Sequence, residues 1–144
     1  IGLYGFGNSK KENKYLKPIA TLKTIISQIH RIEKGESVGY NRAFKSVGFL
    51  KTATLPIGHA DGIGRQYGNG KGYVLINGKK AFIIGNACMD MIMVNITDID
   101  CKEGDEVIVF GKDNTAEDFA NAANTISYEL ITSISQRVKR VFIK

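Results

Sequence analysis

Tyr73-Val74-Leu75-Ile76-Asn77-Gly78-Lys79-Lys80-Ala81-Phe82-Ile83-Ile84 gives the clearest local indication of fold in this chain. An Asn-Gly pair between two hydrophobic runs is the strongest short-range sign of a β-hairpin, because both turn residues need a positive φ. We therefore predict strands at 73–76 and 80–84, joined by a tight turn at Asn77 and Gly78.

Further strands are predicted on both sides of this hairpin. Residues 18–32 are ambiguous: their hydrophobic residues recur every three or four positions, as in a helix, but five isoleucines and two threonines favour a strand, which we predict. The other predicted strands are 1–6, 47–57, 91–96, 106–110 and 138–143.

Helix is predicted only near the C-terminus. Thr115 can cap a helix, because Asp118 follows three residues later and Phe119 begins a hydrophobic face. A second short helix is predicted at 127–133, whereas the polar stretch 8–14 is predicted to be a linker. These short strands and glycine turns indicate a mainly β fold: a small closed Greek-key-like β-barrel with one or two short helices near the C-terminus.

Composition limits the classes of protein. The chain has 144 residues, enough for one domain with its own core, and its hydrophobic fraction of 43% is ordinary for a globular protein. No hydrophobic run approaches the ~20 residues that cross a bilayer. The two cysteines do not make a disulfide framework, so a cytoplasmic location is expected. The abrupt start on a strand-like segment suggests a piece of a longer protein.

Charge and motif spacing exclude several functions. The net charge of +6 fits a nucleic-acid partner or an anionic substrate, but the basic residues are scattered in short clusters. Cys88, Cys101, His30 and His59 match no zinc spacing, so no metal is predicted. The glycine-rich stretch 58–72 lacks the spacing of a Walker loop or of a dinucleotide fingerprint.

One loop holds a candidate catalytic residue. Gly35-Glu36-Ser37-Val38-Gly39-Tyr40-Asn41-Arg42 has glycines on both sides of a polar set, with a tyrosine at its tip. Glycine allows backbone angles that other residues resist, so the loop can display Tyr40 freely. Tyr40 is either a proton-transfer group or a tyrosine packed at the end of a strand.

Five stretches, taken together and in order, resemble the C-terminal domain of alanine racemase, a pyridoxal-phosphate enzyme. They are Leu16-Lys17-Pro18, Gly35-Glu36-Ser37-Val38-Gly39-Tyr40, Pro56-Ile57-Gly58-His59-Ala60-Asp61-Gly62, Gly85-Asn86-Ala87-Cys88-Met89-Asp90 and Arg137-Val138-Lys139-Arg140. The resemblance implies that residues 1–15 are the end of a preceding (β/α)8 barrel domain with a linker, and that residues 16–144 are the β-barrel domain.

The resemblance also implies a reaction and its residues. The full enzyme would be a head-to-tail homodimer that converts L-alanine to D-alanine for peptidoglycan, with pyridoxal 5'-phosphate bound mainly by the barrel domain. Tyr40 matches the catalytic tyrosine, which serves the partner subunit's site. Met89 and Asp90 match a substrate-binding loop, His59 and Arg65 match positions along the substrate access route, and Gln136 stands near the cofactor phosphate in the family.

The chemistry of racemisation agrees with these assignments. A proton leaves Cα from one face and returns to the other, so two acid/base groups must flank a planar carbanion. Using a tyrosinate near pH 7 costs roughly 4 kcal/mol unless a cation assists, and Arg42 is the nearest candidate in sequence. Asn41 replaces a frequent glycine, and asparagine tolerates the left-handed region.

Some residues depart from the family pattern. His59 and Gln136 stand where tyrosine is common, and Asn86 stands where arginine is common. No lysine lies in the family's cofactor-lysine motif, so we expect the isolated domain to be inactive. The alternatives are a basic β-barrel module that binds nucleic acid, and a structural dimerisation module in which Tyr40 is only packed.

Overall fold

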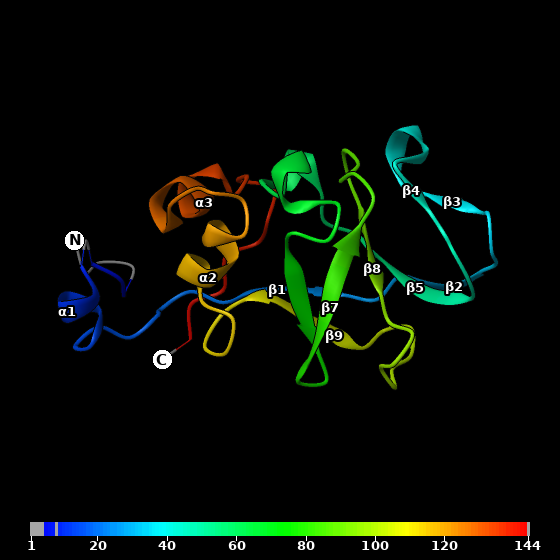
Figure 1. Cartoon of the computed structure of the whole chain (residues 1–144). Coiled ribbons are helices and arrows are strands. Elements are labelled where there is room, and N and C mark those ends of the chain that lie inside the picture. The colour runs from blue at the N-terminus through cyan, green and yellow to red at the C-terminus, as the bar shows by residue number, and fades with distance from the viewer. Residues whose placement is uncertain (1–4, 8, 144) are drawn as a thin grey trace.

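The structure is a computed structural model that describes residues 5–7 and 9–143. A curled antiparallel sheet of seven strands, a half-barrel, forms its centre, in the order β1-β9-β6-β7-β8-β5-β2. Helices α1, α2 and α3 lie towards one end, and the small β3–β4 hairpin lies at the opposite end (Figure 1). The mainly β prediction is therefore confirmed.

The elements have the following bounds. The strands are β1 Leu22–Ile25, β2 Gln28–Ile32, β3 Ser37–Val38, β4 Phe44–Lys45, β5 Leu50–Leu55, β6 Tyr73–Ile76, β7 Lys79–Ile84, β8 Ile92–Asn95 and β9 Glu106–Phe110. The α-helices are α1 Lys10–Asn13, α2 Ala116–Asn121 and α3 Ser127–Ser133, and the 3-10 helices are η1 Tyr40–Arg42, η2 His59–Asp61 and η3 Arg65–Tyr67.

The predicted hairpin begins a Greek key. Strands β6 and β7 pair with Ile76 opposite Lys79, and the turn residues Asn77 and Gly78 have φ angles of 50° and 77°. Both values are positive, as a type I′ turn requires. Strand β8 then pairs with β7, and β9 returns to pair with β6, which gives the spatial order 9-6-7-8.

A single bent segment supplies both edges of the sheet. Strand β1 pairs with β9, and β2 pairs with β5. Between them, Ile26 N–H donates to the carbonyl of Asp105 at 3.0 Å and Ser27 N–H donates to the carbonyl of Thr54 at 2.9 Å. The strand prediction for residues 18–32 is confirmed over the helix alternative, with a bend at residues 26–27 that periodicity alone did not indicate.

The core lies inside the curl and under the helices. Strand β8 shows the expected alternation, with Ile92 and Val94 fully buried and their neighbours partly exposed. Helices α2 and α3 add Phe119 and Leu130, which are also buried. The ring of Phe119 stacks on Tyr67 with centroids 4.5 Å apart, so this pair joins the helices to the η3 turn.

Both C-terminal helices follow the predicted signals. The Thr115 hydroxyl accepts a hydrogen bond from Asp118 N–H at 3.1 Å, and the Asp118 carboxylate accepts one from Thr115 N–H at 3.2 Å. This reciprocal pair is the predicted capping box. Helix α3 spans the residues that the sequence indicated.

Three predictions of secondary structure need correction. Stretch 8–14 is not only linker, because α1 forms a single turn capped by Ser9. Residues 138–143 form no strand, and Val141, Phe142 and Ile143 are 70%, 95% and 91% exposed. Side chains that favour strands do not form one unless a neighbouring strand is there to pair with. The strand predicted at 47–57 shortens to β5. The strand predicted at 1–6 falls largely outside the described residues.

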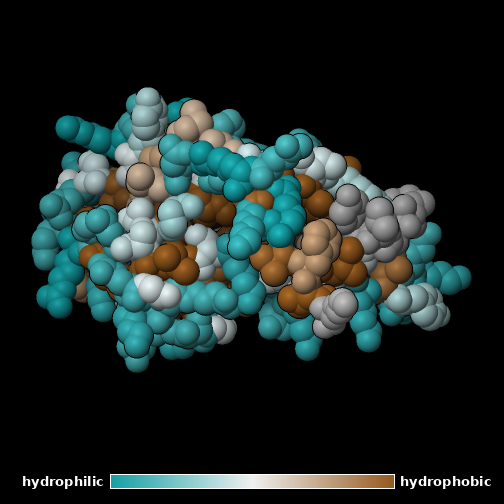
Figure 2. All heavy atoms as spheres, turned by 180° about the vertical axis from the view of Figure 1, so that it is seen from behind, coloured by the Kyte–Doolittle hydropathy of each residue, from teal (hydrophilic) through white to brown (hydrophobic). Residues whose placement is uncertain are grey.

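Hydrophobic atoms are visible at the surface near the chain ends when the molecule is seen from behind (Figure 2). Among the described residues, no helix has the length and hydrophobicity that a bilayer crossing demands.

Gly78→Ala tests the hairpin turn. A Cβ there would meet no atom within 4 Å, but the φ of +77° is strained for any L side chain. We expect a loss of about 1–2 kcal/mol in the free energy of unfolding, measured by urea denaturation. Gly48→Ala is the matched control, because it also has open space but no positive φ, and it should cost nothing. Equal losses in the two variants would contradict this account.

Candidate functional site

The residues that the sequence analysis selected lie on segments that touch each other beside the sheet. The η2 turn packs on loop 85–91 through its backbone: His59 N–H donates to Cys88 O at 2.9 Å, and Ala60 N–H donates to Met89 O at 2.8 Å. At Gly58 the two segments are so close that a Cβ would lie 2.6 Å from Cys88 O. Glycine is therefore required at this contact, and it fixes the path of both loops.

The β3–β4 hairpin displays Tyr40 next to the same loop. Gly39 has a φ of 84°, and a Cβ there would lie 3.2 Å from the backbone nitrogen of Asn86. The side-chain amide of Asn86 donates to the Tyr40 carbonyl at 3.3 Å and accepts from Asn69 at 3.0 Å. Asn41 has a φ of 60°, in the left-handed region that asparagine tolerates better than most residues.

The Tyr40 side chain is exposed and lies against a cation. It is 56% exposed, and the guanidinium carbon of Arg65 lies 5.3 Å from the centre of its ring. That distance is within the range of a cation–π contact. The sequence pointed to Arg42 as the neighbouring cation, but the structure brings Arg65 from the η3 helix to this position.

The neighbouring tyrosines have different surroundings. Tyr67 is 1% exposed, and burial, with a smaller effect of Glu129, raises its pKa to about 12. Its phenol is therefore protonated near neutral pH and is held in the core. Among the residues that the structure describes, the buried hydroxyl of Tyr128 has no hydrogen-bond partner. Tyr40 combines exposure with a cation contact.

The loop that carries Met89 and Asp90, residues 85–91, exposes several of its side chains. Met89 and Met91 are 61% and 42% exposed, and the side chain of Asp90 is also 61% exposed. The loop is nevertheless ordered by its backbone, because Cys88 N–H donates to Met91 O at 2.9 Å in addition to the contacts with the η2 turn. Met89 therefore offers a free apolar side chain on a fixed backbone.

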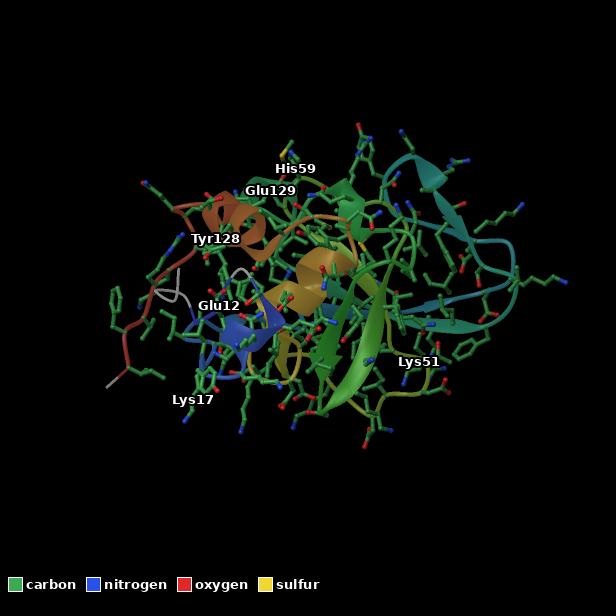
Figure 3. All side chains as sticks on the ribbon, turned by 60° about the vertical axis from the view of Figure 1, so that its left-hand side comes forward. Glu12, Lys17, Lys51, His59, Tyr128 and Glu129 are labelled. Atoms are coloured by element: carbon green, nitrogen blue, oxygen red, sulfur yellow. The ribbon has the colours of Figure 1, made fainter. Side chains whose placement is uncertain are left out.

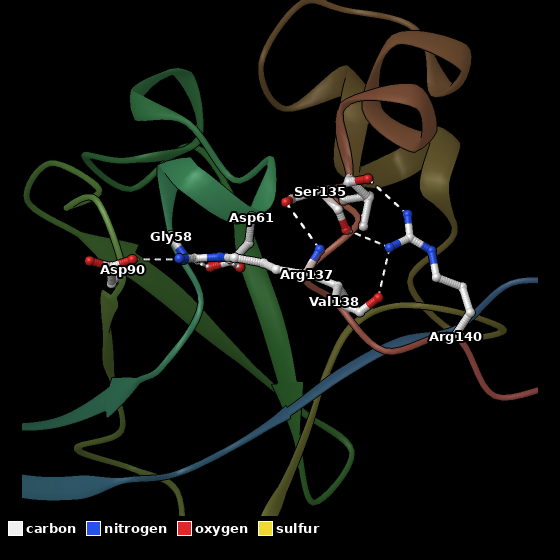
Figure 4. A network of polar contacts seen from close by, with 8 residues as sticks. Gly58, Asp61, Asp90, Ser135, Arg137, Val138 and Arg140 are labelled. Atoms are coloured by element: carbon white, nitrogen blue, oxygen red, sulfur yellow. Dashed lines mark hydrogen bonds and ion pairs between the residues drawn. The ribbon is translucent and has the colours of Figure 1, made fainter.

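An ion-pair network joins three segments at this site (Figure 4). Arg137 binds the buried carboxylate of Asp61 through two nitrogens, Nε at 2.6 Å and NH2 at 3.0 Å. The same NH2 donates to Asp90 Oδ1 at 2.7 Å. Asp61 also accepts the N–H of Gly58 at 2.9 Å.

The network changes the titration of its members. Hydrogen bonds from Arg137 hold the pKa of Asp61 below its usual value, burial opposes this, and the Gly58 N–H adds to the lowering. The hydrogen bonds to Asp61 and then Asp90 raise the pKa of Arg137. At neutral pH both partners are charged, so the pair is a charge-assisted bidentate contact.

His59 lines a separate polar cavity of about 270 Å³ between the η2–η3 segment and α3. Glu129 of α3 lines the same cavity, and its label stands beside that of His59 in Figure 3. Gln66, Tyr67 and Ser133 also line the cavity. The structure thus places His59 and Arg65 at opposite ends of one short segment, and only Arg65 contacts Tyr40.

Gln136 is the residue of this chain that the sequence analysis placed near a phosphate group. Its side chain is exposed, in the turn that follows α3. A phosphate requires several N–H donors or cations, but the guanidinium groups of Arg137 and Arg140 are directed to carboxylates and backbone carbonyls. Gln136 can therefore add one amide donor to a phosphate that other groups hold.

Sequence reasoning did not assign a role to Asp61, Arg137 or Asn69. Asp61 lies in a glycine-rich turn and Arg137 in a short basic cluster, and both patterns are typical of solvated surface. Asn86 was selected only as a departure from a family pattern. Asp61 and Arg137 are 76 residues apart in sequence, and Asn69 and Asn86 are 17 apart. No local sequence pattern could therefore have predicted either pair.

Comparison with known proteins gives a consistent result. The model of the family described as "Alanine racemase, C-terminal domain" matches residues 19–142. The chain belongs to this family. The relative "Alanine racemase 1" of Clostridium acetobutylicum is 46% identical over 152 residues, which cover 100% of this chain and 39% of that protein.

Solved structures of alanine racemases agree. An alanine racemase from Bartonella henselae with covalently bound pyridoxal phosphate has a TM-score of 0.92 and 37% identity, covering 99% of this chain and 40% of that one. The alanine racemase of Clostridium difficile 630 has a TM-score of 0.89 and 42% identity, covering 98% of this chain and 38% of that one. The chain thus spans about two fifths of the length of these relatives.

Asp61→Asn should change the response of this domain to acid. Because the folded pKa of Asp61 is lowered, its charge stabilises the fold above its usual pKa of 3.8, and that stabilisation is lost as pH falls through the lower folded value. We expect the variant to be less stable at pH 7 and to lose less further stability between pH 5 and pH 2, in urea denaturation at a series of pH values. Asp113→Asn, at an exposed site, is the control. A parallel acid profile for Asp61→Asn and wild type would show that the ion pair is not felt in solution.

Proposed function

We propose that this chain is the C-terminal domain of a pyridoxal-phosphate-dependent alanine racemase, and that Tyr40 transfers a proton in the active site of the partner subunit. The observation that supports it most directly is the exposed phenol of Tyr40, displayed on a glycine turn with Arg65 beside its ring. Family membership supplies the reaction class. In this proposal residues 16–144 form the domain, and a preceding barrel domain and a cytoplasmic homodimer complete the enzyme.

Racemisation needs two proton-transfer groups on opposite faces of one carbon. Bound pyridoxal 5'-phosphate would supply the electron sink that makes the Cα proton of alanine acidic. Tyr40 would give or take that proton at its phenol oxygen on one face, and a lysine of the barrel domain would act on the other. A phenol that is 56% exposed can reach a carbon outside its own domain, which a buried tyrosine such as Tyr67 cannot.

The surroundings of Tyr40 fit this role. The guanidinium carbon of Arg65 lies 5.3 Å from the centre of the Tyr40 ring, so a positive charge stands next to the group that would transfer the proton. Asn86 holds the Tyr40 backbone, so the ring is presented from a fixed point. Met89 and Asp90 lie on the adjoining loop, where they would contact the substrate, and His59 and Arg65 would line its access route.

The residues of this chain fit a secondary role toward the cofactor. Gln136 is an exposed amide that could donate one hydrogen bond to the phosphate, while the arginines beside it are occupied. The relative from Bartonella henselae carries pyridoxal phosphate covalently bound. We therefore assign most of the cofactor contacts to the barrel domain.

The nucleic-acid alternative rested on the net charge of +6. In the structure Arg65 lies over Tyr40, Lys80 lies 4.6 Å from the ring centre of Tyr73, and Arg137 binds two carboxylates. Cations already engaged within the chain are less available to a phosphate backbone, so this arrangement favours the racemase.

Tyr40→Phe in the full racemase tests the proposed role. Removing one acid/base group should lower kcat/KM by about 10²–10⁴-fold. L- and D-alanine have equal free energy, so kcat/KM must fall equally in both directions, whereas kcat and the isotope effect of Cα-deuterated alanine should become unequal between them. These are measured by following each enantiomer separately. Tyr15→Phe, at a site that is 85% exposed and outside the loops described above, is the matched control. Unchanged rates for Tyr40→Phe would leave the residue only a packing role.

The isolated 144-residue chain should not racemise alanine. The proposed second proton-transfer group and most of the cofactor contacts belong to the barrel domain, so only one of the two required groups is present. Incubation of the purified chain with L-alanine and pyridoxal phosphate, followed by chiral chromatography, measures this. The same assay on the chain with its barrel domain is the positive control. D-alanine formed by the isolated chain above the cofactor-only background would contradict the assignment.

A further inference from the structure

We propose that Arg137 is a positioning residue for the racemase reaction, and that its two-carboxylate contact holds the Met89–Asp90 loop in the geometry that receives the substrate. This inference rests on the proposed function for its kinetic consequence. Its structural basis is independent, because it comes from contacts within this chain.

The first step is the fixed end of the contact. Asp61 lies in the η2 turn with its side chain 9% exposed, and it binds both Gly58 N–H and the fork of Arg137. A buried carboxylate held by three hydrogen bonds has little freedom to move. Arg137 is therefore anchored to the turn that carries Gly58 and His59.

The second step is the segment that presents Arg137. Its backbone is closed by Arg140, which donates to the carbonyls of Ser135, Val138 and Ile134, the last two at 2.7 and 2.8 Å (Figure 4). Ser135 N–H also donates to the Asp61 carbonyl at 3.2 Å. The guanidinium of Arg137 thus emerges from a turn that is itself fixed to η2, and Gln136 shares that turn.

The third step is the loop that Arg137 reaches. Residues 88–91 expose Met89, Asp90 and Met91, so their side chains bury little surface that could hold the loop. Within the described residues, the side chains of residues 88–91 are held by the hydrogen bond from Arg137 NH2 to Asp90 Oδ1 at 2.7 Å. Arg137 therefore adds a side-chain anchor at Asp90 to a loop whose backbone is already bonded to the η2 turn, and the exposed residues of this loop are proposed to contact substrate.

The fork geometry explains why an arginine is used. Two nitrogens of the Arg137 guanidinium bind Asp61, and one of these also binds Asp90. One planar group therefore holds the two carboxylates at a fixed distance and orientation. Lysine carries one ammonium at the end of a flexible chain and cannot reproduce this fixed arrangement. Displacing a substrate-binding loop by about 1 Å can lower the rate by about 10²-fold. The contact between Arg137 and Asp90 can therefore affect the rate although Arg137 does not touch the substrate.

The test compares variants of the full racemase. Arg137→Gln should lower kcat/KM for alanine by about ten- to a hundredfold, mainly through a higher KM. Arg137→Lys should recover part of that loss, and Asp90→Asn should show a smaller loss. The double variant R137Q/D90N should lose less than the product of the two single losses, since both changes remove the same contact. Arg31→Gln on β2, an exposed arginine outside the site, is the matched control and should leave kinetics unchanged.

A second measurement separates positioning from general stabilisation. In hydrogen exchange of the same proteins, R137Q should speed exchange of the amides of His59 and Ala60, which bond the η2 turn to the loop, and of Cys88, which bonds to Met91 within the loop. The amides of β6–β9 should keep their protection. Wild-type kinetics with wild-type exchange would overturn the proposal, as would faster exchange spread evenly over the domain. If R137Q does not fold, R137K and D90N provide the same two readouts, and unchanged values in both overturn it.

The outcomes also separate this inference from the proposed function. If the wild-type enzyme racemises alanine and Tyr40→Phe is impaired while R137Q is normal, only the role of Arg137 fails. If Tyr40→Phe is normal, the proposed role of Tyr40 fails, and the exchange data on R137Q still decide whether Arg137 holds the loop.

Discussion

The close contact between the Gly58 turn and loop 85–91 is the constraint on which the site depends. Two backbone hydrogen bonds join these segments, and at Gly58 no Cβ could fit between them. Because the loops are fixed to each other, the groups they carry keep a fixed relation: Arg65 follows the turn, Asn86 begins the loop and holds Tyr40, and Asp90 ends beside Arg137. The sheet beneath gives these loops a rigid base, since β7 and β8 run directly into and out of loop 85–91.

The mainly β fold could be predicted because its signals are local. Asn77-Gly78 dictates a turn by its φ requirement, and Thr115 with Asp118 dictates a helix start by two reciprocal hydrogen bonds. The secondary-structure predictions that were wrong rested on residue composition alone, which does not show whether a segment has a pairing strand or a helix cap. Residues 138–143 have β-forming side chains, but no strand in the described part of the chain pairs with them. Helix α1 is a single capped turn inside a stretch whose polarity indicated a linker.

The site was only partly predictable for the same reason. Tyr40, Met89 and Asp90 could be selected from motifs, and the structure places them on exposed loops. Arg65 could be selected too, as a residue of the access route, but its place beside Tyr40 could not be predicted, because the two are 25 residues apart in sequence. The chain after η3 is held to loop 85–91 by the hydrogen bond from Asn69 N–H to Gly85 O at 2.8 Å. The pairing of Asp61 with Arg137 was equally hidden, since an ion pair between a buried carboxylate and a half-exposed arginine 76 residues away leaves no periodic pattern in the sequence.

In the η2 turn, the residues that fix the backbone path are different from the residue whose side chain faces the cavity. Its path is set by Gly58, by the buried Asp61 and by Gly62, whose φ is 102° and where a Cβ would lie 2.6 Å from Ser133 O. His59 contributes its backbone to this arrangement, while its side chain faces the cavity beside Glu129. The turn can therefore accept different side chains at residue 59 without refolding, so directed evolution could change the chemistry of this cavity at one position while the backbone stays the same.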